Sequence, residues 1–376
     1  MKICILGPAF PYKGGIASFN QRMAIELQKM GHEVDIYTFT LQYPKFLFPG
    51  KSQYSNDEAP KDLKIKRAIN SINPFNWWIL GRKIKASNYD LIISKFWLPL
   101  MGPSLGSIIR LGKAKHTKAI ANIDNIIPHE KRLGDFPFAK YFTTAVDAFL
   151  VMSHKVEEDM NKFVNEQPVD YAPHPIYDNY GDIISREAAC KHLNLDPSLN
   201  YILFFGFVRS YKGLDLLLES FKIALKKDSS LRLIIAGEYY ADKSFYTKLI
   251  EDLDLKDYII EHGDFISNEE VKYFFCASDI VAQTYRSATQ SGISQLAIHF
   301  EKPILSTNVG GLPETTIDKE TGYLVNVDQE EIAEAMYHFF NEIDRTSFAK
   351  GIKQLKASFS WERFAKTLLA LYDRIT

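Results

Sequence analysis

Two cationic side chains on one short segment have the clearest capacity for chemistry. Arg209 and Lys212 lie in residues 205–213, FGFVRSYKG, between an apolar run and a helical pattern. A guanidinium offers a fork of donors and an ammonium a point charge, so the two together suit a diphosphate. Gly206 and Gly213 flank the cations and would let a ligand approach the backbone. A solvated polar loop is the alternative, and the flanking glycines favour the diphosphate.

A second glycine segment, residues 7–15, ends in Gly14 and Gly15 directly before a helical pattern. Paired glycines permit close approach of a ligand, and the start of a helix favours an anionic group. The spacing differs from the G-x-G-x-x-G pattern of dinucleotide-binding proteins. Phosphate binding and a plain tight turn therefore both stay open for this segment.

Residues 285–295 are rich in hydroxyl and amide side chains and lead into a predicted helix. Ser291, Gly292 and Ile293 could offer backbone N–H groups to a phosphate at the start of that helix. Gln295, one turn further on, could bond a polyol such as ribose. Ordinary capping of the helix by Ser or Thr explains the same pattern equally well.

A fourth segment, residues 122–130, follows a predicted strand and carries Asp124, Asn125 and His129. Asp124 and Asn125, at the carboxyl end of that strand, could bind sugar hydroxyl groups. The alternative is ordinary turn chemistry, in which Asp and Asn bond their own backbone. His129 is a candidate sugar contact, although a lone histidine is more often structural.

The elements that must position these segments follow from hydrophobic periodicity. In both halves of the chain, apolar runs typical of buried strands alternate with helical spacing, as in residues 16–30 and 213–226. The predicted strands are Ile3–Leu6, Val34–Phe39, Leu91–Ser94, Ala119–Ile123, Ala148–Met152, Tyr201–Phe205, Leu231–Ala236, Ile259–His262, Ile280–Gln283 and Ile304–Ser306. Two such series predict an α/β chain of two doubly wound domains with parallel sheets. Ligands bind beyond the carboxyl ends of such strands, where all four segments fall.

The domain boundary is expected at residues 172–178, APHPIYD, where two prolines disfavour a helix and stiffen the chain. This predicts domains over 1–178 and 179–360, which suits a chain of 376 residues. Residues 361–375 have apolar spacing of a helix, with Ser360 as a candidate N-cap.

Composition excludes several classes of protein. The 45 Lys and Arg residues and 46 Asp and Glu residues leave a net charge of -1, which argues against a general nucleic-acid binder. The three cysteines, Cys4, Cys190 and Cys276, are too scattered for a disulfide framework or a zinc site, which favours a cytoplasmic setting. No apolar run approaches the length of about 18 residues that a membrane-spanning helix needs. The N-terminus also lacks the apolar core of a signal peptide.

One segment, residues 61–85, concentrates positive charge beside aromatic residues. Its aromatic residues are Phe75, Trp77 and Trp78, and its basic residues are Lys61, Lys64, Lys66, Arg67, Arg82, Lys83 and Lys85. Such a combination suits a membrane interface. The alternative places Trp77, Trp78 and Leu80 in the core with the cations in water. Because tryptophan is usually largely buried, the core placement is favoured.

Taken together, these segments resemble glycosyltransferase family 4, whose members are retaining nucleotide-sugar enzymes of the GT-B fold. The resemblance covers nearly the whole chain and rests on five motifs: Gly14–Gly15, residues 206–213 with Lys212, residues 236–238, residues 262–265 and residues 307–314. It implies two Rossmann-like domains that face each other across a cleft. The donor would bind mainly to 179–360 and the acceptor to 1–178, with 361–376 packing back onto the first domain.

The resemblance also implies roles for individual residues. Arg209, Lys212 and Asp124 would be catalytic, with Asp124 standing where the family often has a histidine. Asn125 and His129 would contact the sugar or the acceptor. The donor would be bound by Gly14, Gly15, Gly237, Glu238, Gly263, Asp264, Phe265, Ser291, Gly292, Ile293 and Gln295.

The activity implied is metal-independent, retaining transfer of a sugar from a nucleotide diphosphate sugar to a glycan or lipid-linked acceptor, in cell-surface polysaccharide biosynthesis. No cofactor, metal or nucleic-acid partner is expected, and the protein would be cytoplasmic, with peripheral membrane contact through 61–85. Ser287 and Gln295 stand where the family usually has the glutamates of an E-x(7)-E motif. An alternative is therefore a catalytically silent protein of the same fold that binds nucleotide sugars. A nucleotide-sugar epimerase would need acidic and histidine groups that no motif supplies.

Overall fold

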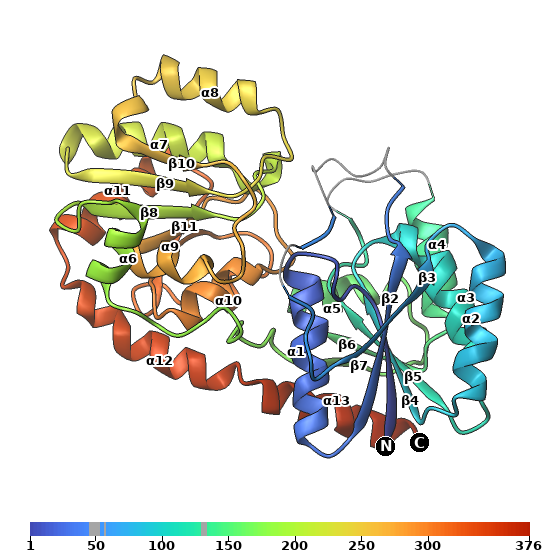
Figure 1. Cartoon of the computed structure of the whole chain (residues 1–376). Coiled ribbons are helices and arrows are strands. Elements are labelled where there is room, and N and C mark those ends of the chain that lie inside the picture. The colour runs from blue at the N-terminus through green and yellow to red at the C-terminus, as the bar shows by residue number, and fades with distance from the viewer. Residues whose placement is uncertain (45–52, 56–57, 129–133) are drawn as a thin grey trace. The chain divides into compact units, whose positions relative to one another are not determined.

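The computed structural model describes residues 1–44, 53–55, 58–128 and 134–376 and contains two compact units (Figure 1). The N-terminal unit comprises Met1–Pro175 together with Phe359–Thr376, and the C-terminal unit comprises Ile176–Ser358. The boundary between Pro175 and Ile176 falls inside the segment 172–178 that the sequence marks as a linker.

The N-terminal unit is built on a seven-stranded parallel sheet of order β3-β2-β1-β4-β5-β6-β7. Its strands are β1 Lys2–Leu6, β2 Glu33–Leu41, β3 Lys64–Asn70, β4 Leu91–Phe96, β5 Lys118–Ile123, β6 Ala148–Val151 and β7 Val169–Tyr171. Its helices are α1 Gly15–Lys29, α2 Pro74–Ala86, α3 Gly102–Gly112, α4 Asp135–Thr143, α5 His154–Met160 and α13 Trp361–Ile375. The strand order reverses between β1 and β4, which makes the loops after these strands a binding position.

The C-terminal unit is built on a six-stranded parallel sheet of order β10-β9-β8-β11-β12-β13. Its strands are β8 Asn200–Phe205, β9 Leu231–Ala236, β10 Ile259–His262, β11 Ile280–Gln283, β12 Ile304–Thr307 and β13 Gly322–Val325. Its helices are α6 Arg186–Leu193, α7 Leu214–Lys227, α8 Lys243–Asp252, α9 Val271–Ala277, α10 Gly292–His299, α11 Gln329–Asn341 and α12 Phe348–Ser358. The order reverses between β8 and β11. The prediction of two doubly wound parallel sheets is thereby confirmed.

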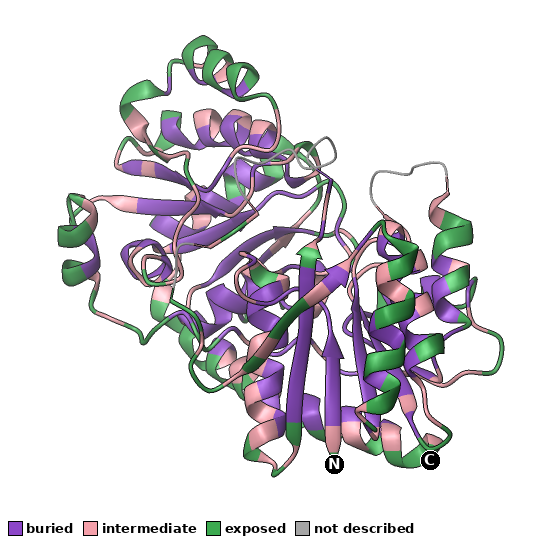
Figure 2. Ribbon diagram, turned by 45° about the vertical axis from the view of Figure 1, so that its right-hand side comes forward, coloured by how far each residue is buried: buried purple, intermediate pink, exposed green. Residues whose placement is uncertain are grey.

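The central strands of both sheets are buried, while the helices cover them with one apolar face and expose the other (Figure 2). In β1 and β4 apolar side chains of both faces are buried, as in Ile3, Ile5, Ile92 and Ile93. Continuous apolar runs are typical of parallel strands that have helices on both faces.

Helix α13 belongs to the N-terminal unit although it follows the whole C-terminal unit in the sequence. The Oγ of Ser360 caps it by accepting a hydrogen bond from the backbone N–H of Arg363. The rings of Trp361 and Phe364 pack on Phe19 of α1, with centroids 5.0 and 5.5 Å away. The apolar stripe of α13 is thus buried against α1.

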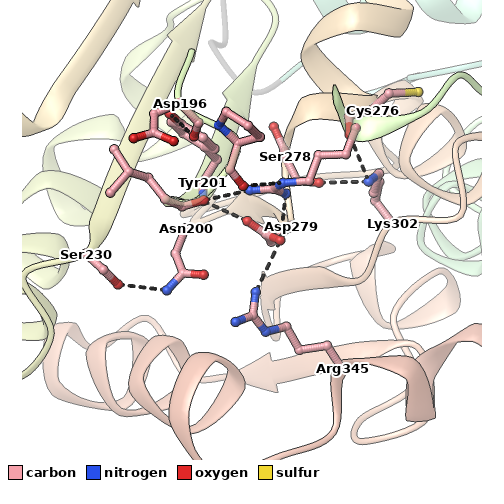
Figure 3. Close-up of polar contacts among 12 residues, drawn as sticks. Asp196, Asn200, Tyr201, Ser230, Cys276, Ser278, Asp279, Lys302 and Arg345 are labelled. Carbon is pink, nitrogen blue, oxygen red and sulfur yellow. Dashed lines mark hydrogen bonds and ion pairs between the residues drawn. The ribbon is translucent and has the colours of Figure 1, made fainter. Parts of the chain in front are cut away.

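A polar network holds the amino edge of the sheet in the C-terminal unit (Figure 3). The carboxylate of Asp279, just before β11, accepts hydrogen bonds from Arg186 at 2.8 Å, Arg345 at 3.2 Å and the backbone N–H of Tyr201 at 2.8 Å. The ammonium of Lys302 donates to two backbone carbonyl groups nearby. The charged residues of this edge are therefore occupied in holding α6 and the strands together, which leaves the carboxyl edge for ligands.

Helix α2 exposes large apolar residues. Leu80 and Ile84 face the core, and Trp77 is half-buried, with its indole Nε1 donating to the carbonyl oxygen of Asn70 at 2.6 Å. Trp78, in contrast, is 50% exposed. The prediction that Trp78 packs in the core was wrong, because the helical period places it on the face opposite Leu80 and Ile84.

No helix within the described residues has both the length and the apolar content that crossing a bilayer requires.

Candidate functional site

The segment after β8 folds back so that Lys212 lies over Gly206. Residues Ser210–Lys212 form a single 3₁₀ turn, and α7 starts directly after Gly213. Gly213 has a φ of +64°, and a Cβ there would lie 2.1 Å from the carbonyl oxygen of Thr284. A Cβ on Gly206 would lie 3.1 Å from Nζ of Lys212. Both glycines are therefore required by the backbone and by the close approach of the lysine.

Lys212 is a buried cation without an anionic partner in the described residues. Its side chain is only 8% exposed, and Nζ makes no hydrogen bond or ion pair there. The nearest compensation is the ring of Tyr285, whose centroid lies 5.6 Å from Nζ. Burial, reinforced by the positive charge of Arg209, lowers the pKa of Lys212 to about 7. Because burying an unpaired charge is unfavourable, this position would be stabilised by an anion supplied from solution.

Arg209 lies beside a group of aromatic rings on the same loop edge. Its guanidinium stacks over Tyr240 at 5.1 Å from the ring centroid. Tyr240 also stacks on Phe207, with centroids 4.4 Å apart, and Phe207 lies 6.3 Å from Phe265. These rings follow β8, β9 and β10, so the carboxyl edge offers both a cation and flat apolar surfaces. Sequence reasoning did not assign a role to Phe207 or Tyr240.

The segments after β8, β9 and β10 are packed so closely that glycine is needed between them. Gly237 has a φ of +147°, and a Cβ there would lie 2.2 Å from the carbonyl oxygen of Gly206. Its N–H donates to the carbonyl oxygen of His262 at 2.9 Å. Next to it, Glu238 is buried, while Asp264 on the neighbouring segment is exposed.

Gly263 lies where a larger side chain would meet neighbouring charged groups. A Cβ on this residue would lie 3.1 Å from both the carboxylate of Glu261 and the ammonium of Lys243, which form an ion pair with each other at 2.5 Å. The structure thus brings the predicted donor residues Gly237, Glu238 and Gly263 to the same edge as Lys212.

Helix α10, after β11, supplies a cap and a buried amide. The Oγ of Ser291 accepts from the backbone N–H of Ile293 at 3.2 Å and from Nε2 of Gln283 at 3.1 Å. The hydroxyl of Ser291 is therefore used for capping. Gln295 is 1% exposed, and its Oε1 has no hydrogen-bond partner among the described residues. Gly292 packs against the ring of Tyr177, where a Cβ would be 2.8 Å away.

In the N-terminal unit, Asp124 follows β5 and forms an ion pair with Lys95 at 2.5 Å. Lys95 lies near the end of β4, its side chain is 1% exposed, and its ammonium also hydrogen-bonds Oδ1 of Asn122. Sequence reasoning missed Lys95. The signal that would have revealed it is a lysine inside the run LIISKF, whose other residues are apolar except for Ser94.

The other residues of this unit that the sequence predicts for the site are Asn125, Gly14, Gly15 and His129. Oδ1 of Asn125 is buried and has no hydrogen-bond partner in the described part of the chain. Gly14 precedes α1 with a φ of +101° and has no atom within 4 Å of where a Cβ would lie, and Gly15 is the first residue of the helix. His129 lies outside the described residues.

Comparison with known proteins identifies relatives along the whole chain. Residues 13–179 match the family model described as Glycosyltransferase Family 4, and residues 185–355 match the model described as Glycosyl transferases group 1. An uncharacterized glycosyltransferase of Methanocaldococcus jannaschii is 23% identical over 100% of this chain and 99% of its own length. A D-inositol 3-phosphate glycosyltransferase of Paenarthrobacter aurescens is 23% identical over 96% of this chain and 92% of its own length.

Solved structures have the same fold. The Anabaena protein Alr3699/HepE, crystallised in complex with UDP, superposes with a TM-score of 0.74 at 15% identity, covering 98% of this chain and 100% of its own. A sucrose-phosphate synthase from Thermosynechococcus elongatus superposes with a TM-score of 0.74 at 17% identity, covering 100% of this chain and 99% of its own.

Proposed function

We propose that this chain, which belongs to glycosyltransferase family 4 and has the GT-B fold, transfers a sugar from a nucleotide diphosphate sugar to a glycan or lipid-linked acceptor with retention of configuration. The observation that carries the donor class is the buried, unpaired ammonium of Lys212 above Gly206. A diphosphate would supply the anion that the described residues do not provide. The UDP bound by the Anabaena structural neighbour supports a ligand of this kind.

Transfer needs charge stabilisation on the departing diphosphate. The bond between the anomeric carbon and the diphosphate oxygen breaks, and a bond from that carbon to the acceptor oxygen forms on the same face. The departing diphosphate takes the proton of the acceptor hydroxyl, so no protein base is required. Lys212, Arg209 and the N–H groups at the start of α7 would stabilise the negative charge on the leaving group without a metal ion.

The aromatic rings beside Arg209 would bind the nucleoside of the donor. Phe207, Tyr240 and Phe265 are partly exposed and lie together at the carboxyl edge, and flat apolar rings are suited to stacking on a nucleobase. Gln295 would bond the ribose, because its buried amide oxygen can accept a hydrogen bond from a hydroxyl group. A tyrosine or phenylalanine face accepts any base, so stacking alone does not choose the nucleotide.

A second candidate is a catalytically silent protein that binds nucleotide sugars. It is favoured by Ser287 and Gln295, which occupy positions where related enzymes usually carry glutamates. Binding by Lys212 would be the same for both candidates, so only turnover separates them.

The experiment that tests the proposal is a binding and turnover screen. The purified chain is titrated with UDP-, GDP- and ADP-sugars by calorimetry, and release of free nucleoside diphosphate is followed by chromatography. We expect one nucleotide class to bind and to be slowly hydrolysed, and Lys212→Met to lose about 100-fold in turnover. Binding without any turnover would select the silent protein, and no binding to any sugar nucleotide would refute both candidates.

The acceptor is proposed to lie at an anionic membrane surface reached through α2. Phe75 is 81% exposed, and Trp78 and Ile79 follow it on the exposed side of this helix. Arg82 stacks over Trp78 at 5.0 Å from the ring centroid, and Lys83 adds a further cation. Exposed aromatic residues beside cations suit the headgroup region, where each cation near anionic lipid contributes about 1 kcal/mol.

Co-sedimentation with vesicles containing phosphatidylglycerol tests the membrane contact. Binding should fall as salt rises, and it should be lost in the double variant Phe75→Ser, Trp78→Ser. Phe245→Ser, which removes an exposed aromatic residue of α8, is the matched control and should bind like the wild type. A protein that never co-sediments, even at low salt, would instead require a soluble acceptor.

A further inference from the structure

Lys95 is surrounded by residues from three parts of the N-terminal unit, namely α1, the segment after β1 and the end of β5. Its ammonium lies 3.7 Å from the ring centroid of Phe19, which belongs to α1. Its Cβ lies 3.0 Å from where a Cβ on Gly7 would be. On its remaining sides it meets Asn122 and Asp124 at the end of β5. The ammonium of Lys95 is therefore held beside Asp124 by contacts from α1 and from β5.

The partners of Lys95 are themselves fixed. Nδ2 of Asn122 donates to the carbonyl oxygen of Leu150 on β6 at 3.3 Å, so the amide oxygen of Asn122 faces the ammonium. The backbone N–H of Asp124 donates to the carbonyl oxygen of Phe96 at 2.8 Å, which holds the start of the loop against β4. The carboxylate of Asp124 thus has a defined position at the carboxyl edge of the sheet.

Charge and exposure distinguish the two members of this pair. The side chain of Lys95 is 1% exposed and that of Asp124 is 15% exposed, so only the carboxylate can meet a ligand. His174 also packs on Phe19, and burial, with Lys95 nearby, lowers the pKa of His174 to about 3. The histidine is neutral at physiological pH, so it adds no positive charge beside the carboxylate.

A buried ion pair contributes little net stability, because the desolvation of both charges offsets their attraction. Apolar residues of similar volume would fill this position at least as well. The pair is therefore better explained by a task that needs an oriented carboxylate at the surface of the unit.

We propose that Lys95 is a positioning residue that holds the carboxylate of Asp124 to accept hydrogen bonds from hydroxyl groups of the transferred sugar. This rests on the proposed transfer from a nucleotide diphosphate sugar. A carboxylate only accepts hydrogen bonds, so the sugar must present free hydroxyl groups to Asp124. Lys95 does not touch the substrate and acts only through Asp124.

A double-mutant cycle of Lys95→Met, Asp124→Ala and the combined variant tests this, with the purified full chain and the sugar nucleotide that the wild type uses. Lys95→Met should lower kcat/KM for transfer by about 100-fold, the scale of a misplaced binding group. Affinity for the free nucleoside diphosphate, which lacks the sugar, should be unchanged. The combined variant should be no slower than Asp124→Ala alone, because a lysine that acts through Asp124 has nothing left to position.

The other outcomes overturn the proposal. Wild-type transfer by Lys95→Met would show that the pair is only structural, and losses that multiply in the combined variant would show that Lys95 acts independently of Asp124. If the affinity of Lys95→Met for the free nucleoside diphosphate fell as much as its kcat/KM, the substitution would have disturbed the whole site and not only the position of Asp124. If Lys95→Met fails to melt cooperatively, Lys95→Gln, which keeps an N–H donor, replaces it in the same cycle. A wild type that transfers no sugar refutes the proposed function itself, whereas an active wild type with an active Lys95→Met refutes only the role of Lys95.

Discussion

The protonation of Lys212 should make donor binding depend on pH. In the free protein, burial and the charge of Arg209 lower the pKa of Lys212 from an ordinary value of 10.5 to about 7. A bound diphosphate pairs with the ammonium and raises this pKa again. The bound state therefore holds the proton more tightly than the free state. For this reason the affinity for the donor is highest below pH 7 and falls as the pH rises.

The magnitude follows from the difference between the two states. At pH 9 the free lysine is mostly neutral and must take up a proton before it can pair with the diphosphate. Two pH units above the pKa correspond to about 2.7 kcal/mol, so the affinity at pH 9 should be about 100-fold weaker than at pH 6. Stability changes in the opposite sense. The unfolded chain binds this proton more tightly, so the free protein should become more stable as pH rises above about 7.

Calorimetric titration between pH 6 and pH 9 measures this effect directly. The ligand should be the sugar nucleotide, because its diphosphate has no ionisation in that range. Titrations in buffers of different ionisation enthalpy should reveal uptake of about one proton at pH 9. Lys212→Met should bind more weakly and independently of pH, whereas Lys227→Met, at the exposed far end of α7, should behave like the wild type. An affinity that is flat with pH in the wild type would refute the assignment of Lys212 to the diphosphate.

Three further predictions concern single residues. Gln295→Ala should weaken donor binding by about 1–3 kcal/mol, whereas Gln295→Glu should be tolerated, and unchanged affinity of the alanine variant by calorimetry would make Gln295 structural. Gly310→Ala would place a Cβ 1.5 Å from the carbonyl oxygen of Ala288 and should lower the free energy of unfolding by about 2 kcal/mol or more. Gly311→Ala, at an ordinary φ of -92°, is its control in thermal melts. Trp361→Ala should cost about 3–5 kcal/mol in urea unfolding, because the ring is buried against α1, and a loss under 1 kcal/mol would contradict that packing role.

The sequence predicted the strands whose side chains are buried on both faces. The strands β1, β8 and β9 are apolar except for one polar or charged residue near the start of each, and burial between two layers of helices is the usual reason for such runs. The strands that were missed lie at or near sheet edges. β3, of sequence KIKRAIN, alternates charged and apolar residues and is largely exposed, and β7 has only three residues. Their pairing depends on a neighbouring strand, which local periodicity does not reveal.

The residues of the candidate site also divide into those that the sequence predicted and those that it missed. Among the glycines that the backbone requires, Gly206 was visible because it flanks the cations of its segment, and Gly237 because residues 236–238 resemble a motif of the family. The pairing of Lys95 with Asp124 could not be predicted, because the two residues are distant in the sequence and meet only when β4 and β5 pair. Trp78 was misplaced because tryptophan is usually buried, whereas its position on α2 turns it toward solvent.

Among the described residues, two buried lysines, Lys95 and Lys212, and the half-buried Lys302 differ in what neutralises or solvates their charge. Lys302, at the amino edge of the C-terminal sheet, donates to backbone carbonyl groups, and Lys95 pairs with a carboxylate. Lys212 alone has neither kind of partner among the described residues. A lysine that is partnered by groups of the protein keeps its protonation state when a ligand binds. A lysine whose anionic partner is the ligand itself takes up a proton when that ligand binds. Proton uptake on donor binding should therefore disappear in Lys212→Met and persist in Lys95→Met, although both variants lose activity.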